Sequence, residues 1–135
     1  MNVEEEKQLA AHAAADMVET GMRVGLGTGS TVAYLLVELA RRNLKAVHVA
    51  TSPRTAEAAR ALGILVEPFN VLDRLDLCID GADQIATSGW LIKGGGGAQT
   101  REKIVAASAE RFIVIADSTK LVDQLHPPVP LELLA

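Results

Sequence analysis

The chain has 135 residues, of which 49% are hydrophobic and 22% are charged, and its formal net charge is −4. This length is typical of one domain, and the hydrophobic fraction excludes an intrinsically disordered chain. Because aromatic residues make up 3% of the sequence and the net charge is negative, a nucleic-acid-binding protein is not expected.

The N-terminus and the single cysteine bear on the compartment. The chain begins Met-Asn-Val-Glu-Glu-Glu, which is acidic where a signal peptide is basic and apolar. No apolar run approaches the roughly 20 residues that span a bilayer. Cys78 lies in an apolar run, which predicts a buried structural thiol and no internal disulfide. We therefore expect a cytoplasmic protein.

Residues 3–18 predict an N-terminal helix. Asn2 is a suitable N-cap, and Glu5, three residues further on, completes a capping-box pattern. An apolar stripe with a spacing of four residues indicates the side that faces the core, and it consists of Leu9, Ala13 and Met17.

Strands and helices then alternate as far as residue 63. A strand over 22–26 leads into a helix over about 31–42, whose predicted core residues are Val32, Leu35, Leu36 and Leu39. A strand over 46–50 precedes Ser52, which can cap a helix that opens at Pro53 and ends at Gly63.

The second half continues this alternation. Strands are expected at 64–66 and 75–79, a helix over about 98–109, and a strand buried on both faces at 112–116, because that run is apolar throughout. The pattern predicts an α/β fold, Rossmann-like, with a mostly parallel sheet and helices on both faces. Residues 1–125 are expected to form this domain, and residues 126–135 a proline-rich linker with a strand-like tail.

Ligands of such sheets bind beyond the carboxyl ends of the strands, and the first candidate segment there is Gly25-Leu-Gly-Thr-Gly-Ser-Thr31. Its backbone amides, the following helix N-terminus and three hydroxyls are suited to a phosphomonoester. A dinucleotide site is disfavoured, because the spacing is G-x-G-x-G and the strand over 46–50 ends without an acidic residue. A tight glycine turn capped by Ser30 is the structural alternative.

Asp80 and Asp83 directly follow the strand at 75–79. Two carboxylates there can flank a polyol or share a proton, although Asp-Gly is also a common turn pair. The three histidines, His12, His48 and His126, show no ligand spacing, so a metal site is not expected. His48 is interpreted as a strand residue and His12 as a helix-surface residue.

Lys93 precedes four consecutive glycines, which a fold tolerates where the backbone must approach something closely. Free N–H groups beside a lysine predict a cradle that stabilises an oxyanion, and a flexible surface loop is the alternative. Glu102 lies about one turn into the next helix and can point back to the cradle, although a glutamate there is usually solvated. With Lys120 after the strand at 112–116, these groups suit proton abstraction next to the carbonyl of a phosphorylated sugar.

Together these motifs resemble the ribose-5-phosphate isomerase A family. They occur in that family's order and spacing, from Lys7 to about Pro130. The segments that carry the resemblance are 25–31, Thr51-Ser52, 80–83, 93–98, 100–104 and 117–120.

The resemblance implies the interconversion of D-ribose 5-phosphate and D-ribulose 5-phosphate through an enediolate, in the pentose phosphate pathway, with no metal and no cofactor. It implies Glu102 as the general base and Lys93 as the group that stabilises the enediolate oxygen. Asp80 and Asp83 would contact the sugar hydroxyls and assist ring opening. The implied substrate-binding residues are Lys7, Thr28, Gly29, Ser30, Thr31, Gly81, Ala82, Gly94, Gly95, Gly96 and Lys120.

Two features depart from the family pattern. Gln84 stands where members usually have glutamate, at a site that is expected to be peripheral to the chemistry. Members also continue past the position of Ala135 into a second, smaller α/β domain, so the chain is expected to be a short form that lacks it.

Alternatives to an isomerase are a catalytically weak or inactive sugar-phosphate-binding module and a nicotinamide-dependent oxidoreductase, the latter disfavoured by the loop spacing. The expected partners are a small sugar phosphate and further copies of the chain in a homo-oligomer (dimer or higher). Neither nucleic acid nor a membrane is expected as a partner.

Overall fold

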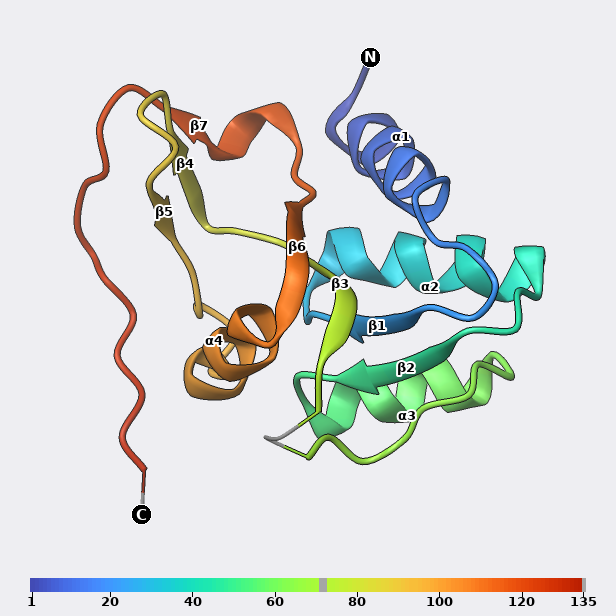
Figure 1. Cartoon of the computed structure of the whole chain (residues 1–135). Coiled ribbons are helices and arrows are strands. Elements are labelled where there is room, and N and C mark those ends of the chain that lie inside the picture. Colours follow the sequence, from blue (N-terminus) through green and yellow to red (C-terminus); the bar gives the residue numbers. More distant parts are fainter. Residues whose placement is uncertain (71–72, 135) are drawn as a thin grey trace.

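The computed structural model describes residues 1–70 and 73–134 (Figure 1). Its main sheet has four parallel strands in the order β2-β1-β3-β6. These are β1 (Arg23–Leu26), β2 (Val47–Ala50), β3 (Leu75–Asp80) and β6 (Ala109–Val114). The α/β fold with a parallel sheet is therefore confirmed.

The strand order places a topological switch point between β1 and β3. From β1 the chain moves outward to β2, and it then returns to β3 and continues to β6 on the other side. Leu26 pairs with Ile79, so the carboxyl ends of β1 and β3 lie side by side. The loops that leave these two strands diverge there, which opens a crevice at this edge of the sheet.

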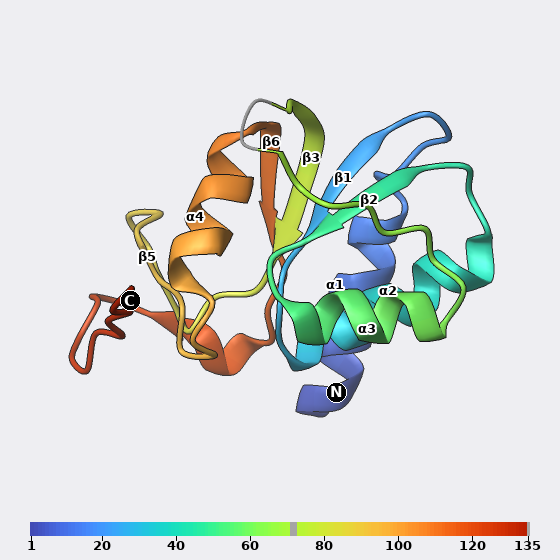
Figure 2. The same cartoon turned by 90° about the horizontal axis from the view of Figure 1, so that it is seen from below.

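Helices cover both faces of the sheet, as predicted (Figures 1 and 2). On one face α1 (Val3–Ala15) packs against α2 (Ser30–Arg42), and α4 (Gln99–Ala107) packs on the opposite face against β3 and β6. The third helix, α3 (Pro53–Ala61), lies along β2. Gly25 permits the close approach of α4, because a Cβ there would lie 2.6 Å from Cγ1 of Val105.

A small second sheet was not predicted from the sequence. It has the order β5-β4-β7, with β4 (Gln84–Ala86) antiparallel to β5 (Leu91–Ile92) and parallel to β7 (Leu121–Val122). A short 3-10 helix, η1 (Ser118–Lys120), leads into β7. Strands of two or three residues are too short to show a hydrophobic period, so the sequence carried no signal for them.

The helix caps and the α2 core follow the predictions. Asn2 and Glu5 form the capping box of α1, and the Ser52 side chain accepts from the Thr55 backbone at the start of α3. The predicted core residues of α2 are all buried.

The predicted apolar stripe of α1 is wrong. Leu9 is 58% exposed and Met17 38% exposed, and Ala13 is exposed as well. The buried residues are instead small, and they are Ala11, Ala14, Ala15 and, just past the helix, Val18. Alanines on this side let α1 approach α2 closely, and a stripe chosen by side-chain size misses such a contact.

Three further expectations about strands need correction. Phe112 is 38% exposed, because β6 is the edge strand of the main sheet and is not buried on both faces. Residues 64–66 make a single bridge, between Val66 and His48, instead of a strand. Residues 131–134 pair with no strand, and their leucines are exposed; Ala135 lies outside the described residues.

The two histidines His12 and His48 and the single cysteine lie where the sequence predicts them. His48 is a buried strand residue and His12 lies on the surface of α1, as predicted. Cys78 is fully buried, and burial raises the pKa of its thiol to about 12, so it stays protonated. No helix in the described part of the chain is long and apolar enough to cross a bilayer.

Two residues of α2 can test which side of this helix packs into the core. Leu35 is fully buried and Val37 is 53% exposed on the same helix. Leu35→Ala should lower the free energy of unfolding by about 2–5 kcal/mol, because it leaves a cavity. Val37→Ala should change it by less than about 0.5 kcal/mol. Urea denaturation measures both, and equal losses would contradict this assignment of the core.

Candidate active site

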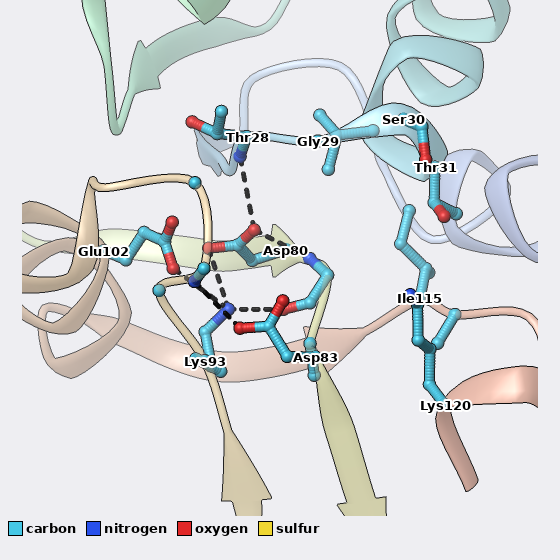
Figure 3. Close-up of a pocket in the computed structure, with 17 residues that line it drawn as sticks. Thr28, Gly29, Ser30, Thr31, Asp80, Asp83, Lys93, Glu102, Ile115 and Lys120 are labelled. Atoms are coloured by element: carbon cyan, nitrogen blue, oxygen red, sulfur yellow. Dashed lines mark hydrogen bonds and ion pairs between the residues drawn. The ribbon is translucent and has the colours of Figure 1, made fainter. Parts of the chain in front are cut away.

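A polar pocket opens at the carboxyl ends of β1 and β3, in the crevice of the switch point (Figure 3). All the site residues expected from the sequence line it except Lys7. The lining residues are Thr28, Gly29, Ser30, Thr31, Val32, Asp80, Gly81, Ala82, Asp83, Lys93, Gly94, Gly95, Gly96, Glu102, Ile115, Ala116 and Lys120.

Three charged side chains meet at the floor of this pocket (Figure 3). Lys93 Nζ lies 3.2 Å from Asp80 Oδ2 and 3.2 Å from Glu102 Oε1, and it also donates to the Gly81 carbonyl. Asp80 ends β3, Lys93 follows β5, and Glu102 lies in the first turn of α4. The ammonium group of Lys93 therefore forms ion pairs with two carboxylates that come from different elements.

Both carboxylates of this cluster are buried. Asp80 is 1% exposed and Glu102 is 4% exposed. Burial raises the pKa of Glu102, and the charge of Asp80 raises it further, while Lys93 opposes both effects. Burial likewise raises the pKa of Asp80 against the charge of Lys93. A glutamate with a raised pKa is a stronger base than an exposed one, which suits it to remove a proton from carbon.

Asp80 is held by the loop that follows β1. Its Oδ1 accepts from the backbone N–H groups of Thr28, at 3.2 Å, and Gly81, at 2.7 Å. Gly27 makes this approach possible, because a Cβ at that position would lie 1.8 Å from Asp80 Oδ1. The glycine-rich segment thus positions a carboxylate as well as lining the pocket.

Asp83 fixes the second glycine loop. Its Oδ2 accepts from the Gly95 backbone N–H at 2.8 Å, and the Gly97 N–H donates to the Gly94 carbonyl at 3.0 Å. The prediction that the N–H groups of this loop are free is therefore wrong for Gly95 and Gly97, because each of these N–H groups has an acceptor. Positive φ angles at Gly94 (+91°) and Gly97 (+86°) explain why glycine is favoured at both ends of this loop.

The hydroxyl of Thr28 is engaged away from Asp80. Its Oγ1 lies 3.0 Å from that of Thr51, 2.9 Å from Ser52 Oγ and 3.1 Å from Thr55 Oγ1. The backbone nitrogen of Thr28 is the atom that faces Asp80 (Figure 3). Of the three hydroxyls expected for a phosphate, the Thr28 hydroxyl therefore links the β1 and β2 loops instead.

The structure does not bring Lys7 to the pocket. Lys7 Nζ pairs with Glu4 Oε1 at 3.1 Å, one turn away on α1. Three hydrophobic residues line the pocket although the sequence did not indicate them. They are Val32 at the start of α2, and Ile115 and Ala116 after β6. Their position at a strand end or a helix start could have indicated them. An apolar side chain at such a position does not by itself indicate a role in binding or catalysis.

Gln84 lies outside the pocket lining and ties the C-terminal tail to β4. Its side-chain nitrogen donates to the His126 carbonyl at 2.9 Å, and its oxygen accepts from the His126 N–H at 3.0 Å. A glutamate carboxylate can only accept, so the amide explains why glutamine fits here.

No group of three or more His, Cys, Asp or Glu side chains within the described ranges is arranged to hold a metal ion. The polar groups that line the described pocket are carboxylates, lysines, hydroxyls and backbone amides.

The contact between Gly27 and Asp80 can be tested by adding one methyl group. Gly27→Ala should lower the free energy of unfolding by about 1–3 kcal/mol or more, because the new Cβ overlaps the Asp80 carboxylate. Gly96→Ala is the matched control, since a Cβ there meets nothing within 4 Å. Its unfolding free energy should stay within about 0.5 kcal/mol of wild type. Equal stability of the two variants in urea denaturation would refute the contact.

Comparison with known proteins places this geometry in a family. The model of the ribose 5-phosphate isomerase A (phosphoriboisomerase A) family matches residues 47–135. The ribose-5-phosphate isomerase A of Gloeobacter violaceus is 53% identical over an alignment 132 residues long, which covers 93% of this chain and 57% of that protein.

Solved structures agree with the sequence comparison. A D-ribose-5-phosphate isomerase in complex with phospho-erythronic acid matches with a TM-score of 0.88 at 42% identity, over 93% of this chain and 57% of that one. The ribose 5-phosphate isomerase A of Methanocaldococcus jannaschii gives 0.85 at 39% identity, over 90% and 56% of the two chains. The chain thus spans less than two thirds of the length of these relatives. Over that span, it belongs to the ribose 5-phosphate isomerase A family.

Proposed function

We propose that the chain interconverts D-ribose 5-phosphate and D-ribulose 5-phosphate through an enediolate, as a step of the pentose phosphate pathway. The observation that carries the proposal is the buried cluster of Glu102, Lys93 and Asp80 at the floor of the pocket. Membership of the ribose 5-phosphate isomerase A family supports the substrate and the reaction.

The phosphate group would bind where α2 begins. The first turn of a helix presents unpaired N–H groups and the positive end of its dipole, and Ser30 and Thr31 add hydroxyls there. Lys120, on η1, lines the same pocket and supplies a cation. The sugar chain would then extend from this end of the pocket toward the charge cluster.

Glu102 would move the proton. Its carboxylate removes the proton from C2 of the open-chain aldose, and the C–H electrons form the C1–C2 double bond of the enediolate. The carbonyl electrons of C1 move onto O1 as this double bond forms. Return of the proton to C1, together with transfer of the C2 hydroxyl proton to O1, gives the ketose with its carbonyl group at C2. Lys93, beside the carboxylate at 3.2 Å, offsets the negative charge that develops on the oxygen.

The aspartates would act before this step. Asp80 and Asp83 line the pocket, and we assign them contacts with the sugar hydroxyls and a part in ring opening. Asp83 also fixes the Gly95 amide, so it shapes the loop that faces the enediolate. Gly29, Gly81, Ala82, Gly94 and Gly96 would contact the substrate through their backbone. No cofactor is required by this sequence of steps.

A module that binds sugar phosphate without turnover is the second candidate. Such a module needs the hydroxyls and the helix N-terminus, but it gains nothing from two carboxylates buried around one lysine. Burying charged groups is costly, so their presence favours an enzyme.

The wider setting is also a proposal. We assign the isomerase domain to residues 1–125 and a linker with a tail to 126–135, in a cytoplasmic protein that forms a homo-oligomer. The exposed leucines of the tail (Leu131, Leu133 and Leu134) and the edge strand β6 support self-association. The net charge of −4 gives no support to nucleic acid as a partner.

Replacement of the base tests the mechanism. Glu102→Gln should reduce kcat for ribose 5-phosphate by about 10²–10⁴-fold, because the amide cannot take the proton. The variant should stay folded and no less stable at neutral pH, because burial disfavours the charge that it removes and Asp80 still pairs with Lys93. A coupled assay of ribulose 5-phosphate formation without added metal measures kcat.

Glu110→Gln is the matched control for this experiment. Glu110 is an exposed glutamate on β6, outside the pocket lining, so the kcat of the Glu110→Gln enzyme should equal that of wild type. A Glu102→Gln enzyme with kcat within tenfold of wild type would sink the mechanism. Binding of phospho-erythronic acid without any turnover by the wild-type chain would favour the binding module.

The pH profile of kcat/KM tests the state of Glu102 in the free enzyme. The base must be ionised, so kcat/KM falls as the pH drops through the pKa of Glu102 in the substrate-free chain. Since burial and Asp80 raise this pKa, the midpoint of the acid limb should lie above 4.5, the ordinary value for glutamate. Rates at ribose 5-phosphate concentrations well below KM across the acidic range give the midpoint. A limb at or below 4.5 would contradict a raised pKa of Glu102.

A further inference from the structure

Glu132, in the C-terminal tail, makes one specific contact with the body of the protein. Its Oε2 accepts from the Thr100 backbone N–H at 2.6 Å, across 32 positions of sequence. Hydrogen bonds from the Thr100 backbone and side chain lower the pKa of Glu132, so the carboxylate is ionised at neutral pH.

The bond falls where α4 lacks a cap of its own. The N-cap residue is Ala98, whose methyl group cannot accept a hydrogen bond, and Thr100 is the second residue of the helix. The first N–H groups of a helix need partners, and a carboxylate there also complements the helix dipole. Glu132 thus supplies from the tail the cap that the local sequence does not encode.

This helix start connects two parts of the active site. The glycine loop at 94–97 runs directly into Ala98, and Glu102 projects from the first turn of α4 toward Lys93. Movement of that turn would therefore move both the base and the end of the loop. A shift of about 1 Å in a reacting group can lower a rate by up to about 10²-fold.

The tail is placed by polar contacts and not by its leucines. Leu131 is 86% exposed and Leu133 is 95% exposed, whereas Glu132 between them is half-buried. At the other end of the tail, Gln84 binds the backbone of His126 through two hydrogen bonds. The tail thus runs between two polar anchors, one on β4 and one on α4.

We propose that Glu132 is a positioning residue for the isomerase reaction, and that its carboxylate caps α4 and so holds Glu102 at its working distance from Lys93. The kinetic part of this inference rests on the proposed function, whereas the capping part does not. Glu132 lines a hollow beside the active site with Arg54 and Arg101, and is not itself part of the catalytic pocket.

The test compares three variants of the full 135-residue chain. Glu132→Ala should lower kcat for ribose 5-phosphate about tenfold and change KM less than about twofold, because the phosphate end of the pocket is untouched. Glu132→Gln keeps an oxygen that can accept from Thr100, so its kcat should stay within about threefold of wild type. Glu110→Ala, at an exposed glutamate away from α4, should match wild type.

Hydrogen exchange on the substrate-free chain provides the second readout. Glu132→Ala should speed exchange of the Thr100 and Glu102 amides several-fold, and Glu132→Gln should not. Unchanged exchange in Glu132→Ala would overturn the cap. Faster exchange with unchanged kcat would overturn the positioning role. A wild-type chain without isomerase activity would instead defeat the proposed function, and the exchange rates would still decide whether Glu132 caps the helix.

Discussion

The active-site architecture depends on Lys93, whose ammonium group lies 3.2 Å from each of two buried carboxylates. Asp80 comes from the main sheet, Glu102 from α4, and Lys93 from the segment after β5. Buried ion pairs add little to stability, because desolvation offsets their attraction. The cluster is therefore better explained by chemistry: it joins three segments into one site and leaves a base with a raised pKa beside a cation.

The same cluster makes stability depend on pH in a defined direction. The pKa values of Asp80 and Glu102 are raised in the folded chain, so it binds more protons than the unfolded chain between the ordinary and the raised values. Each group therefore stabilises the fold most below its ordinary pKa, and this contribution is lost as the pH rises through the raised value. The proposed mechanism requires an ionised Glu102, and this loss of stability accompanies that ionisation.

Much of the site could be predicted from sequence, because parallel strands end at the same edge of a sheet. Interpreting 22–26 and 75–79 as strands of one parallel sheet places the segments that follow them at the same edge of that sheet, and β1 and β3 are in fact neighbours there. What the sequence could not show were contacts made across the fold. The Asp83 bond to Gly95 and the contacts of the Thr28 hydroxyl with other hydroxyls depend on tertiary distances. The pair of Lys7 with Glu4 is different, because the two residues lie one turn apart on α1 and their spacing in the sequence could have indicated it. The edge position of β6 and the cap from Glu132 likewise follow from topology and not from local pattern.

Titration of the Glu102 carboxyl carbon by NMR, in the wild-type chain and in Asp80→Asn, measures whether the two carboxylates form one buried, coupled cluster. The wild-type midpoint should lie above 4.5, because burial raises the pKa of Glu102 and Asp80 adds to it. In Asp80→Asn the midpoint should move down, since the charge of Asp80 that raises the pKa of Glu102 is removed. A wild-type midpoint at the ordinary value, unmoved by Asp80→Asn, would contradict the existence of a coupled, buried cluster.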